Sequence, residues 1–149
     1  MSIQTEVNEQ IKTAMKAKDT VSLEALRALK SAFLLANTSG ANVSMSEAEE
    51  LKIVQKLVKQ RQDSASIYSE QGRMDLAEPE LAQARVLEQF LPKQMGEAEL
   101  TSAIQTIINS SGASSIKDMG KVMGIASKDL AGQADGKSIS EVVKKLLAG

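Results

Sequence analysis

Apolar residues recur at helical spacing along almost the whole chain, and no segment shows the strict alternation of a half-buried strand. A spacing of three or four residues places side chains on one face of an α-helix, whereas strand side chains change face at every residue. The chain has only 2 prolines to interrupt such helices. The sequence therefore predicts an all-α fold with seven helices.

Four of these helices are expected in the first part of the chain. The first begins at about Ile3 and ends near Lys18-Asp19, where a second helix starts at Thr20 and forms a hairpin with it. Residues 37–42, NTSGAN, are typical of a turn. We expect a third helix after this turn, reaching Gly72.

Two capping boxes are predicted to open the third and fourth helices. In this pattern a Ser, Thr or Asp precedes the helix, and an acidic residue three positions later bonds back to it. Ser46 with Glu49 fits the third helix, and Asp75 with Glu78 fits the fourth. Pro79 lies close enough to the first turn to be tolerated or to bend the helix. The fourth helix ends at Leu91-Pro92, since the residue before proline avoids the helical region.

Beyond Pro92 we predict a linker at 93–96 and a small three-helix tail at 97–149, with residues 1–92 forming the larger part. The fifth helix is expected to end at Gly112 and the sixth to begin at about Ile116. The seventh is expected to open with the capping box Ser138/Glu141. The tail is short enough for its independent stability to be marginal.

Several classes of function are excluded by composition. The chain has no Cys, His or Trp, so a disulfide framework, a thiol nucleophile and zinc chemistry are not expected. We expect no metal and no cofactor. No apolar run is long enough for a membrane span or a signal peptide, which predicts a cytoplasmic protein without a membrane partner. The net charge of −1 conceals an acidic segment at 62–99 and a mildly basic tail after 112.

The segment GQADGKS, residues 132–138, resembles a phosphate-binding loop that leads into a helix. It has three residues between its glycines where a P-loop has four, and no strand precedes it, which makes an NTPase improbable. Glycines, a lysine and free helix N–H groups can still hold a phosphate of a nucleic-acid backbone. A plain turn between helices explains the segment equally well.

Ser114-Ser115-Ile116-Lys117 has the Ser-x-x-Lys spacing in which a lysine amine can deprotonate a serine. The companion motifs of serine acylases are absent, and either serine is well placed to cap a helix. Capping is the better interpretation, and no catalytic residue is assigned.

Gly120 and Gly124 lie four residues apart on one helical face. Each glycine in a helix interior costs about 1 kcal/mol relative to alanine, so the pair indicates a close approach. The approaching group is either a neighbouring helix backbone or an RNA sugar-phosphate chain. Lys117, Lys121 and Lys128 make the surroundings positive, which suits phosphate.

Together these segments are similar to the GatB/YqeY family. The similarity runs in order through LRALKSA at 26–32, KLVKQRQDSASIY at 56–68, GRMDLAEPELAQ at 72–83, FLPKQM at 90–95, GASSIKDMGKVMG at 112–124 and ADGK at 134–137. The resemblance implies an all-α fold with a larger helical part followed by a three-helix tail. It also implies a relation to the tail of the B subunit of the tRNA-dependent amidotransferase, which contacts the tRNA body without bond chemistry.

Carried over to this chain, the resemblance makes Lys117, Gly120, Lys121, Gly124, Gly136 and Lys137 candidate nucleic-acid contacts. Gln133 departs from the family, which commonly has Arg or Lys there, and removes one possible phosphate contact. Phe90 replaces a usual Tyr, and Pro79 interrupts a usually helical acidic stretch.

Three functions follow as hypotheses. The first is a non-catalytic tRNA-binding accessory, for which a carbon–nitrogen ligase label with glutamine as donor would be inherited from amidotransferase relatives. The second is a protein-interaction module that docks a synthetase or amidotransferase through the acidic middle or the Met119/Met123 surface. The third and weakest is an amidase using Ser115 or Ser114 with Lys117, for which we expect no turnover.

Overall fold

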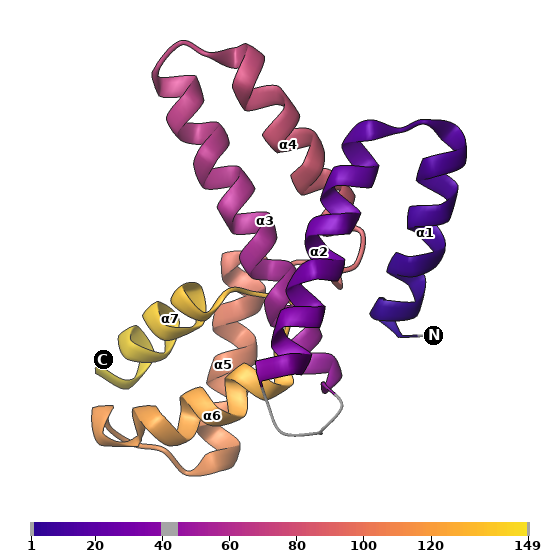
Figure 1. The fold of residues 1–149 in the computed structure, drawn as a ribbon. Helices are drawn as coiled ribbons and strands as arrows, with labels where there is room; N and C mark the ends of the chain where they lie inside the picture. The colour runs from indigo at the N-terminus through magenta and orange to yellow at the C-terminus, as the bar shows by residue number, and fades with distance from the viewer. Residues whose placement is uncertain (1, 40–44, 149) are drawn as a thin grey trace. The chain divides into compact units, whose positions relative to one another are not determined.

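The computed structural model describes residues 2–39 and 45–148. These residues form seven α-helices and one short 3-10 helix, and they contain no strand, so the predicted all-α class is confirmed (Figure 1). The elements are α1 (Ile3–Ala17), α2 (Thr20–Ser39), α3 (Glu47–Glu70), α4 (Met74–Glu88), α5 (Glu97–Ser111), η1 (Ile116–Asp118), α6 (Met119–Asp129) and α7 (Gly136–Ala148). No helix among the described residues is long and apolar enough to cross a membrane.

The chain divides into two compact units, Met1–Leu91 and Pro92–Gly149. Two residues of the predicted linker are bonded within the second unit. The Met95 backbone N–H donates to the Gln133 carbonyl at 2.9 Å, and Gln94 Nε2 donates to the Gly132 carbonyl at 2.6 Å. Gln94 and Met95 therefore belong structurally to the second unit.

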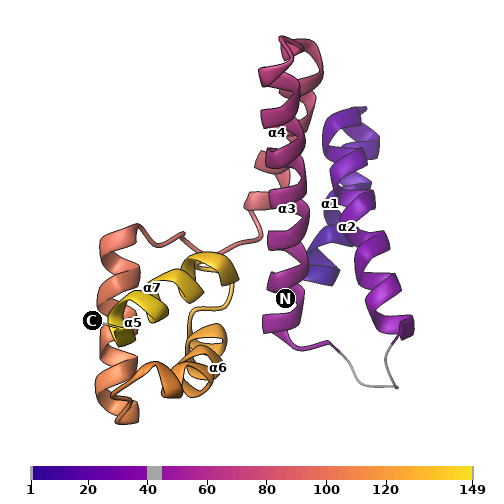
Figure 2. The ribbon, with the colours of Figure 1, turned by 90° about the vertical axis from the view of Figure 1, so that its left-hand side faces the viewer.

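The first unit consists of two helical hairpins, α1–α2 and α3–α4, with α2 packed against both α3 and α4 (Figure 2). Its core is aliphatic apart from two phenylalanines, and comprises Val7, Ala14, Ala25, Leu26, Leu29, Phe33, Val54, Val58, Ala84, Leu87 and Phe90. Gln83 joins three helices, because its Oε1 accepts from Arg61 Nε on α3 and its Nε2 donates to Glu24 Oε2 on α2, both at 3.0 Å.

Helix starts in the first unit agree with the sequence in two places. α2 begins at Thr20, where the Asp19 carboxylate accepts from the Ser22 backbone N–H at 3.1 Å. The predicted capping box at Ser46 and Glu49 is present in α3.

The turn predicted at 37–42 is wrong in part: residues 37–39 belong to α2, whereas 40–42 lie outside the described residues.

The predicted capping box at Asp75 and Glu78 is wrong. α4 begins one residue before Asp75, at Met74, and its N-cap Arg73 makes no side-chain capping bond. The Asp75 carboxylate instead accepts from Arg73 Nε and Nη2 at 3.0 and 2.9 Å. Pro79 lies inside α4, which continues past it to Glu88. A proline so near a helix start interrupts few intrahelical bonds.

The second unit packs α5, α6 and α7 around a core without aromatic residues: Leu100, Ile104, Ile107, Ile108, Val122, Ala126, Leu130, Ala134, Ile139, Val143 and Leu147. α5 ends at Ser111 with Gly112 as its C-cap, as predicted, and this glycine has φ +72°, a left-handed conformation that glycine adopts without a Cβ penalty. The predicted box at Ser138 and Glu141 is wrong, since α7 begins at Gly136 and the Asp135 carboxylate accepts from the Ser138 backbone N–H at 2.7 Å.

Candidate nucleic-acid interface

The outward face of α6 carries four exposed positions in succession: Gly120, Lys121, Gly124 and Lys128. The opposite face holds Val122 and Ala126, which are fully buried in the core of the second unit. Spacings of three, four and seven residues place the four exposed positions on one side of the helix. We call this surface, together with Lys117 on η1, the α6 face.

The two glycines of the α6 face have no packing partner. A Cβ added at Gly120 or Gly124 would meet no other atom within 4 Å. The interpretation that these glycines let a neighbouring helix approach is therefore wrong for the residues that the structure describes. Both positions instead leave the peptide backbone of α6 open at the surface.

Lys121 connects α6 to the end of α5. Its Nζ donates to the Ser111 carbonyl at 2.9 Å, and Ser111 is the last residue of α5. A lysine at this place satisfies a carbonyl that has no intrahelical donor and complements the negative end of the helix dipole. Lys121 thus has a structural role besides any ligand contact.

Asp118 fixes the loop before α6. Its Oδ2 accepts from the backbone N–H groups of Ser114 and Ser115, at 2.9 and 3.3 Å. These bonds stabilise the ionised carboxylate and lower the pKa of Asp118, and the nearby charge of Lys121 acts in the same direction. Ser115 is the N-cap of η1, in agreement with the capping interpretation of the Ser-x-x-Lys segment. Neither serine hydroxyl bonds to Lys117 in the described chain.

The remaining lysines of the α6 face are unpaired. Lys117 and Lys128 are exposed, and neither makes a hydrogen bond or an ion pair with a described residue. Over residues 2–39 and 45–148 the ion pairs are Lys59–Asp63 and Arg73–Asp75, both in the first unit. An exposed ammonium without a carboxylate partner remains available for a phosphate oxygen.

Gly136 and Lys137 lie apart from the α6 face. They lie in the first turn of α7, which follows the end of α6, and Figure 1 shows the two helices running in roughly opposite directions. Eight residues of α6 separate Lys121 from Asp129, a rise of about 12 Å. The structure brings together Lys117, Gly120, Lys121 and Gly124, and places Gly136 and Lys137 near the far end of α6.

The start of α7 already has an acidic cap. The Asp135 carboxylate accepts from the backbone N–H of Ser138, and Asp135 lies two residues before Lys137 in the sequence. Gly132 has φ +78° and its carbonyl accepts from Gln94, so it shapes the turn before α7. This geometry is that of a capped interhelical turn and differs from a loop that surrounds a phosphate with free N–H groups.

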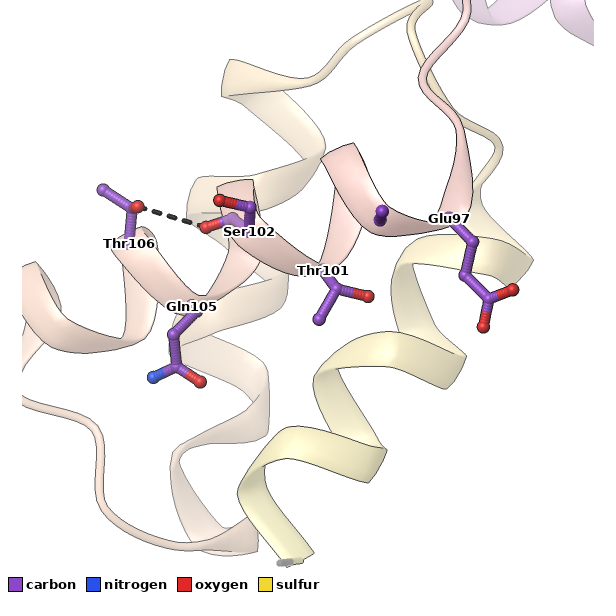
Figure 3. A pocket seen from close by; sticks show the side chains of 6 residues that line it. Glu97, Thr101, Ser102, Gln105 and Thr106 are labelled. Atoms are coloured by element: carbon purple, nitrogen blue, oxygen red, sulfur yellow. Dashed lines mark hydrogen bonds between the residues drawn. The ribbon is translucent and has the colours of Figure 1, made fainter.

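Two pockets on the second unit lack the positive charge that would bind a phosphate. An open depression on α5 is lined by Glu97, Ala98, Thr101, Ser102, Gln105 and Thr106 (Figure 3). A cleft of about 440 Å³ is lined by Gln94, Met95, Glu97, Leu100, Gln133, Ala134, Ser138, Glu141, Val142 and Lys145. The first has no cation and the second has two carboxylates to one ammonium. The described residues hold no group of three acidic side chains placed to bind a metal ion.

Comparison with known proteins identifies the family. A family model described as Yqey-like protein matches residues 4–147. This chain belongs to the YqeY-like family. It is also 36% identical over 84 residues to "Altered inheritance of mitochondria protein 41, mitochondrial" of Meyerozyma guilliermondii, a match that covers 54% of this chain and 42% of that protein. The chain thus corresponds to less than half of this relative's length.

Lys128 is not among the nucleic-acid contacts that the sequence of this YqeY-like chain predicts, although its charge adds to the positive surroundings of the two glycines. The structure places it on the exposed side of α6, four residues after Gly124 and seven after Lys121. That spacing is two helical turns, so the sequence contained the information needed to include it.

Proposed function

We propose that this chain is a non-catalytic accessory protein that binds tRNA through the α6 face. The observation that carries the proposal is the pair of exposed helix glycines, whose added Cβ atoms would meet nothing. Helix glycines cost stability, and no internal contact accounts for them here. A ligand backbone that lies directly against α6 would account for their presence.

The charges around the glycines favour an anionic ligand. Lys117, Lys121 and Lys128 flank Gly120 and Gly124, and Lys117 and Lys128 have no protein partner among the described residues. The arrangement suits a sugar-phosphate chain, with ammonium groups on phosphate oxygens and the strand close to the helix. The resemblance to the amidotransferase tail points to tRNA as that ligand.

Recognition by shape is favoured over recognition of bases. Every aromatic residue of the chain, Phe33, Tyr68 and Phe90, precedes the second unit. Proteins that read unpaired bases commonly stack them on aromatic side chains, and the second unit has none. We infer that the α6 face follows the folded backbone of the tRNA body. Gly136 and Lys137 make a separate, weaker contact in this proposal.

The location of the protein stays a prediction. The sequence led us to expect a cytoplasmic protein, and the relative from Meyerozyma guilliermondii carries the word mitochondrial in its name. Both compartments contain tRNA, so the proposed activity is compatible with either.

The test is a titration of the full chain against bulk tRNA and against an unstructured RNA of equal length, at two salt concentrations. We expect tighter binding of tRNA and a loss of affinity with rising salt, because neutralised phosphates release counterions. Lys117→Glu and Lys128→Glu should each weaken binding to all tRNAs, and loss of one phosphate contact reduces the salt slope by about 1.

Lys52→Glu is the matched control, since Lys52 is exposed on α3 and has no ion-pair partner in the described chain. It should leave the titration unchanged. Binding that does not depend on salt, or that responds equally to all three reversals, would contradict the α6 face as the site. Binding of both RNAs with one affinity would contradict shape recognition.

A further inference from the structure

One face of α7 and the start of α5 line a cleft within the second unit. Its volume is about 440 Å³. α7 contributes Ser138, Glu141, Val142 and Lys145, whose spacings of three, four and seven residues place them on one side of the helix. The first turn of α5 contributes Glu97, whose side chain extends toward α7 in Figure 3. We call this space the α5–α7 cleft.

The floor of the α5–α7 cleft is apolar. Leu100 is 4% exposed and Ala134 is 9% exposed, and both belong to the core of the second unit. Met95 and Val142 also line the cleft and are partly buried against the same core. The hydrocarbon part of a small ligand would leave water by covering this floor, which favours binding.

Hydrogen bonds fix one wall of the cleft. The Met95 backbone N–H donates to the Gln133 carbonyl, and Gln94 Nε2 donates to the Gly132 carbonyl. These two bonds connect the segment before α5 to the turn before α7. Gln94, Met95 and Gln133 all line the cleft, so this wall exists before any ligand arrives. A preformed site loses little conformational entropy when a ligand binds.

Charges of both signs lie unpaired at the cleft. Glu97, Glu141 and Lys145 are exposed, and none of them makes a hydrogen bond or an ion pair with another residue that the structure describes. Glu141 precedes Lys145 by four residues, which is the favourable order and spacing for a helical ion pair. The two side chains are nevertheless not paired. Two carboxylates and one ammonium are therefore available to a ligand.

We propose that the α5–α7 cleft binds a free α-amino acid with an apolar side chain. The ammonium group of the ligand lies between Glu97 and Glu141, its carboxylate contacts Lys145, and its side chain covers Leu100 and Val142. A phosphate would meet two carboxylates, and a simple amine would leave Lys145 without a partner, so a ligand with both charges fits best. The cleft shares no residue with the α6 face, and this inference goes beyond tRNA binding.

The probe is L-leucine, compared with three molecules that each lack one of its groups. Isocaproate lacks the ammonium, isoamylamine lacks the carboxylate, and glycine lacks the apolar side chain. Each is titrated into the full chain and followed by NMR chemical shifts. We expect saturable binding of leucine with shifts at the cleft. Isocaproate and isoamylamine should bind at least about threefold more weakly, as for loss of one partly solvated ion pair. Glycine should bind at least about tenfold more weakly, because it buries no side chain.

The variants test each charge separately. Lys145→Gln should weaken leucine binding at least about threefold and abolish the preference for leucine over isoamylamine. Glu141→Gln should weaken it similarly and reduce the preference for leucine over isocaproate. The matched controls are Lys144→Gln and Glu99→Gln. Both residues are exposed on the same two helices but do not line the cleft, so neither change should affect binding.

Several results would overturn the proposal. These are absence of saturable leucine binding, shifts that lie outside the cleft, and an equal loss of affinity in the control variants. Tighter binding of isoamylamine than of leucine would assign the cleft to a cationic amine instead. Circular dichroism verifies that each variant folds. Glu141→Gln should leave the tRNA titration unchanged, so failure of this proposal is distinguishable from failure of tRNA binding.

Discussion

Replacing Gly124 by alanine should stabilise the second unit while weakening tRNA binding. Gly124 is the sixth of the 11 residues of α6, so it lies in the helix interior. Alanine is favoured over glycine there by about 0.8–1.0 kcal/mol. Beyond its chain neighbours and the nearby backbone of α6, the new methyl group meets no atom within 4 Å, so no clash offsets this gain. For a unit of this size, such a change raises the melting temperature by about 4–8 °C.

Hydrogen exchange of core amides in α5, α6 and α7 measures this stability without interference from the first unit. The matched control is Gly112→Ala, which also has open space but has φ +72° at the end of α5. A Cβ in that left-handed conformation costs about 1–2 kcal/mol, so this variant should destabilise. Replacing glycine by alanine should therefore raise the stability of the second unit at position 124 and lower it at position 112.

The reasoning fails if Gly124→Ala destabilises the second unit, because the glycine would then be needed for packing. A stabilised variant that binds tRNA with unchanged affinity would refute the close approach of RNA at this position. Gly120→Ala should stabilise less, since Gly120 is the second residue of α6 and lies in its first turn.

Two further predictions concern stability. Ile104→Ala should cost about 2–5 kcal/mol in the second unit, because Ile104 is fully buried, and hydrogen exchange in that unit measures the loss. Asp118→Asn should destabilise the second unit at neutral pH but not in strong acid. Folding lowers the pKa of Asp118, so its carboxylate stabilises the folded unit above the unfolded pKa of about 3.9. This stabilisation is lost as the pH falls through the folded pKa. Urea unfolding of the chain with and without the change, followed by NMR at neutral and acidic pH, measures the difference, and a difference that does not depend on pH would contradict the assignment.

The helices themselves could be predicted because their stripes and several ends depend on nearby residues. Gly112 ends α5 through its own conformation, and Ser46 with Glu49 caps α3 through bonds three residues apart. Such interactions are local, so the sequence contains all of their partners.

The two wrong capping boxes show where local patterns become ambiguous. Asp75 has the spacing of a cap to Glu78, but the guanidinium of Arg73 binds its carboxylate with two charge-assisted bonds. Before α7 two caps compete, and Asp135 satisfies the N–H of Ser138, which makes Ser138 a donor within the first turn. In the first place the predicted cap Asp75 binds a different partner, and in the second place a different residue, Asp135, supplies the cap.

The interactions of the α6 face depended on contacts that the sequence does not specify. Lys121 bonds to the Ser111 carbonyl across ten residues, which requires the angle between α5 and α6. The exposure of Gly120 and Gly124 likewise depends on which side of α6 the other helices cover. Periodicity identified these residues as one face of a helix but could not decide whether that face was inside or outside.

The separation of the two glycine motifs limits how the second unit can bind RNA. Lys121 lies at the start of α6, whereas Lys137 follows its end, and the intervening rise of about 12 Å exceeds the Debye length of about 8 Å at physiological salt. We therefore expect the two lysines to contact different phosphates of a bound RNA. Since Lys121 is also bonded to α5, Lys117 and Lys128 are the residues whose reversal reports on RNA with the least effect on folding. An RNA that binds both motifs must follow α6 along its length, which is the direction that the bare backbone at Gly120 and Gly124 leaves open.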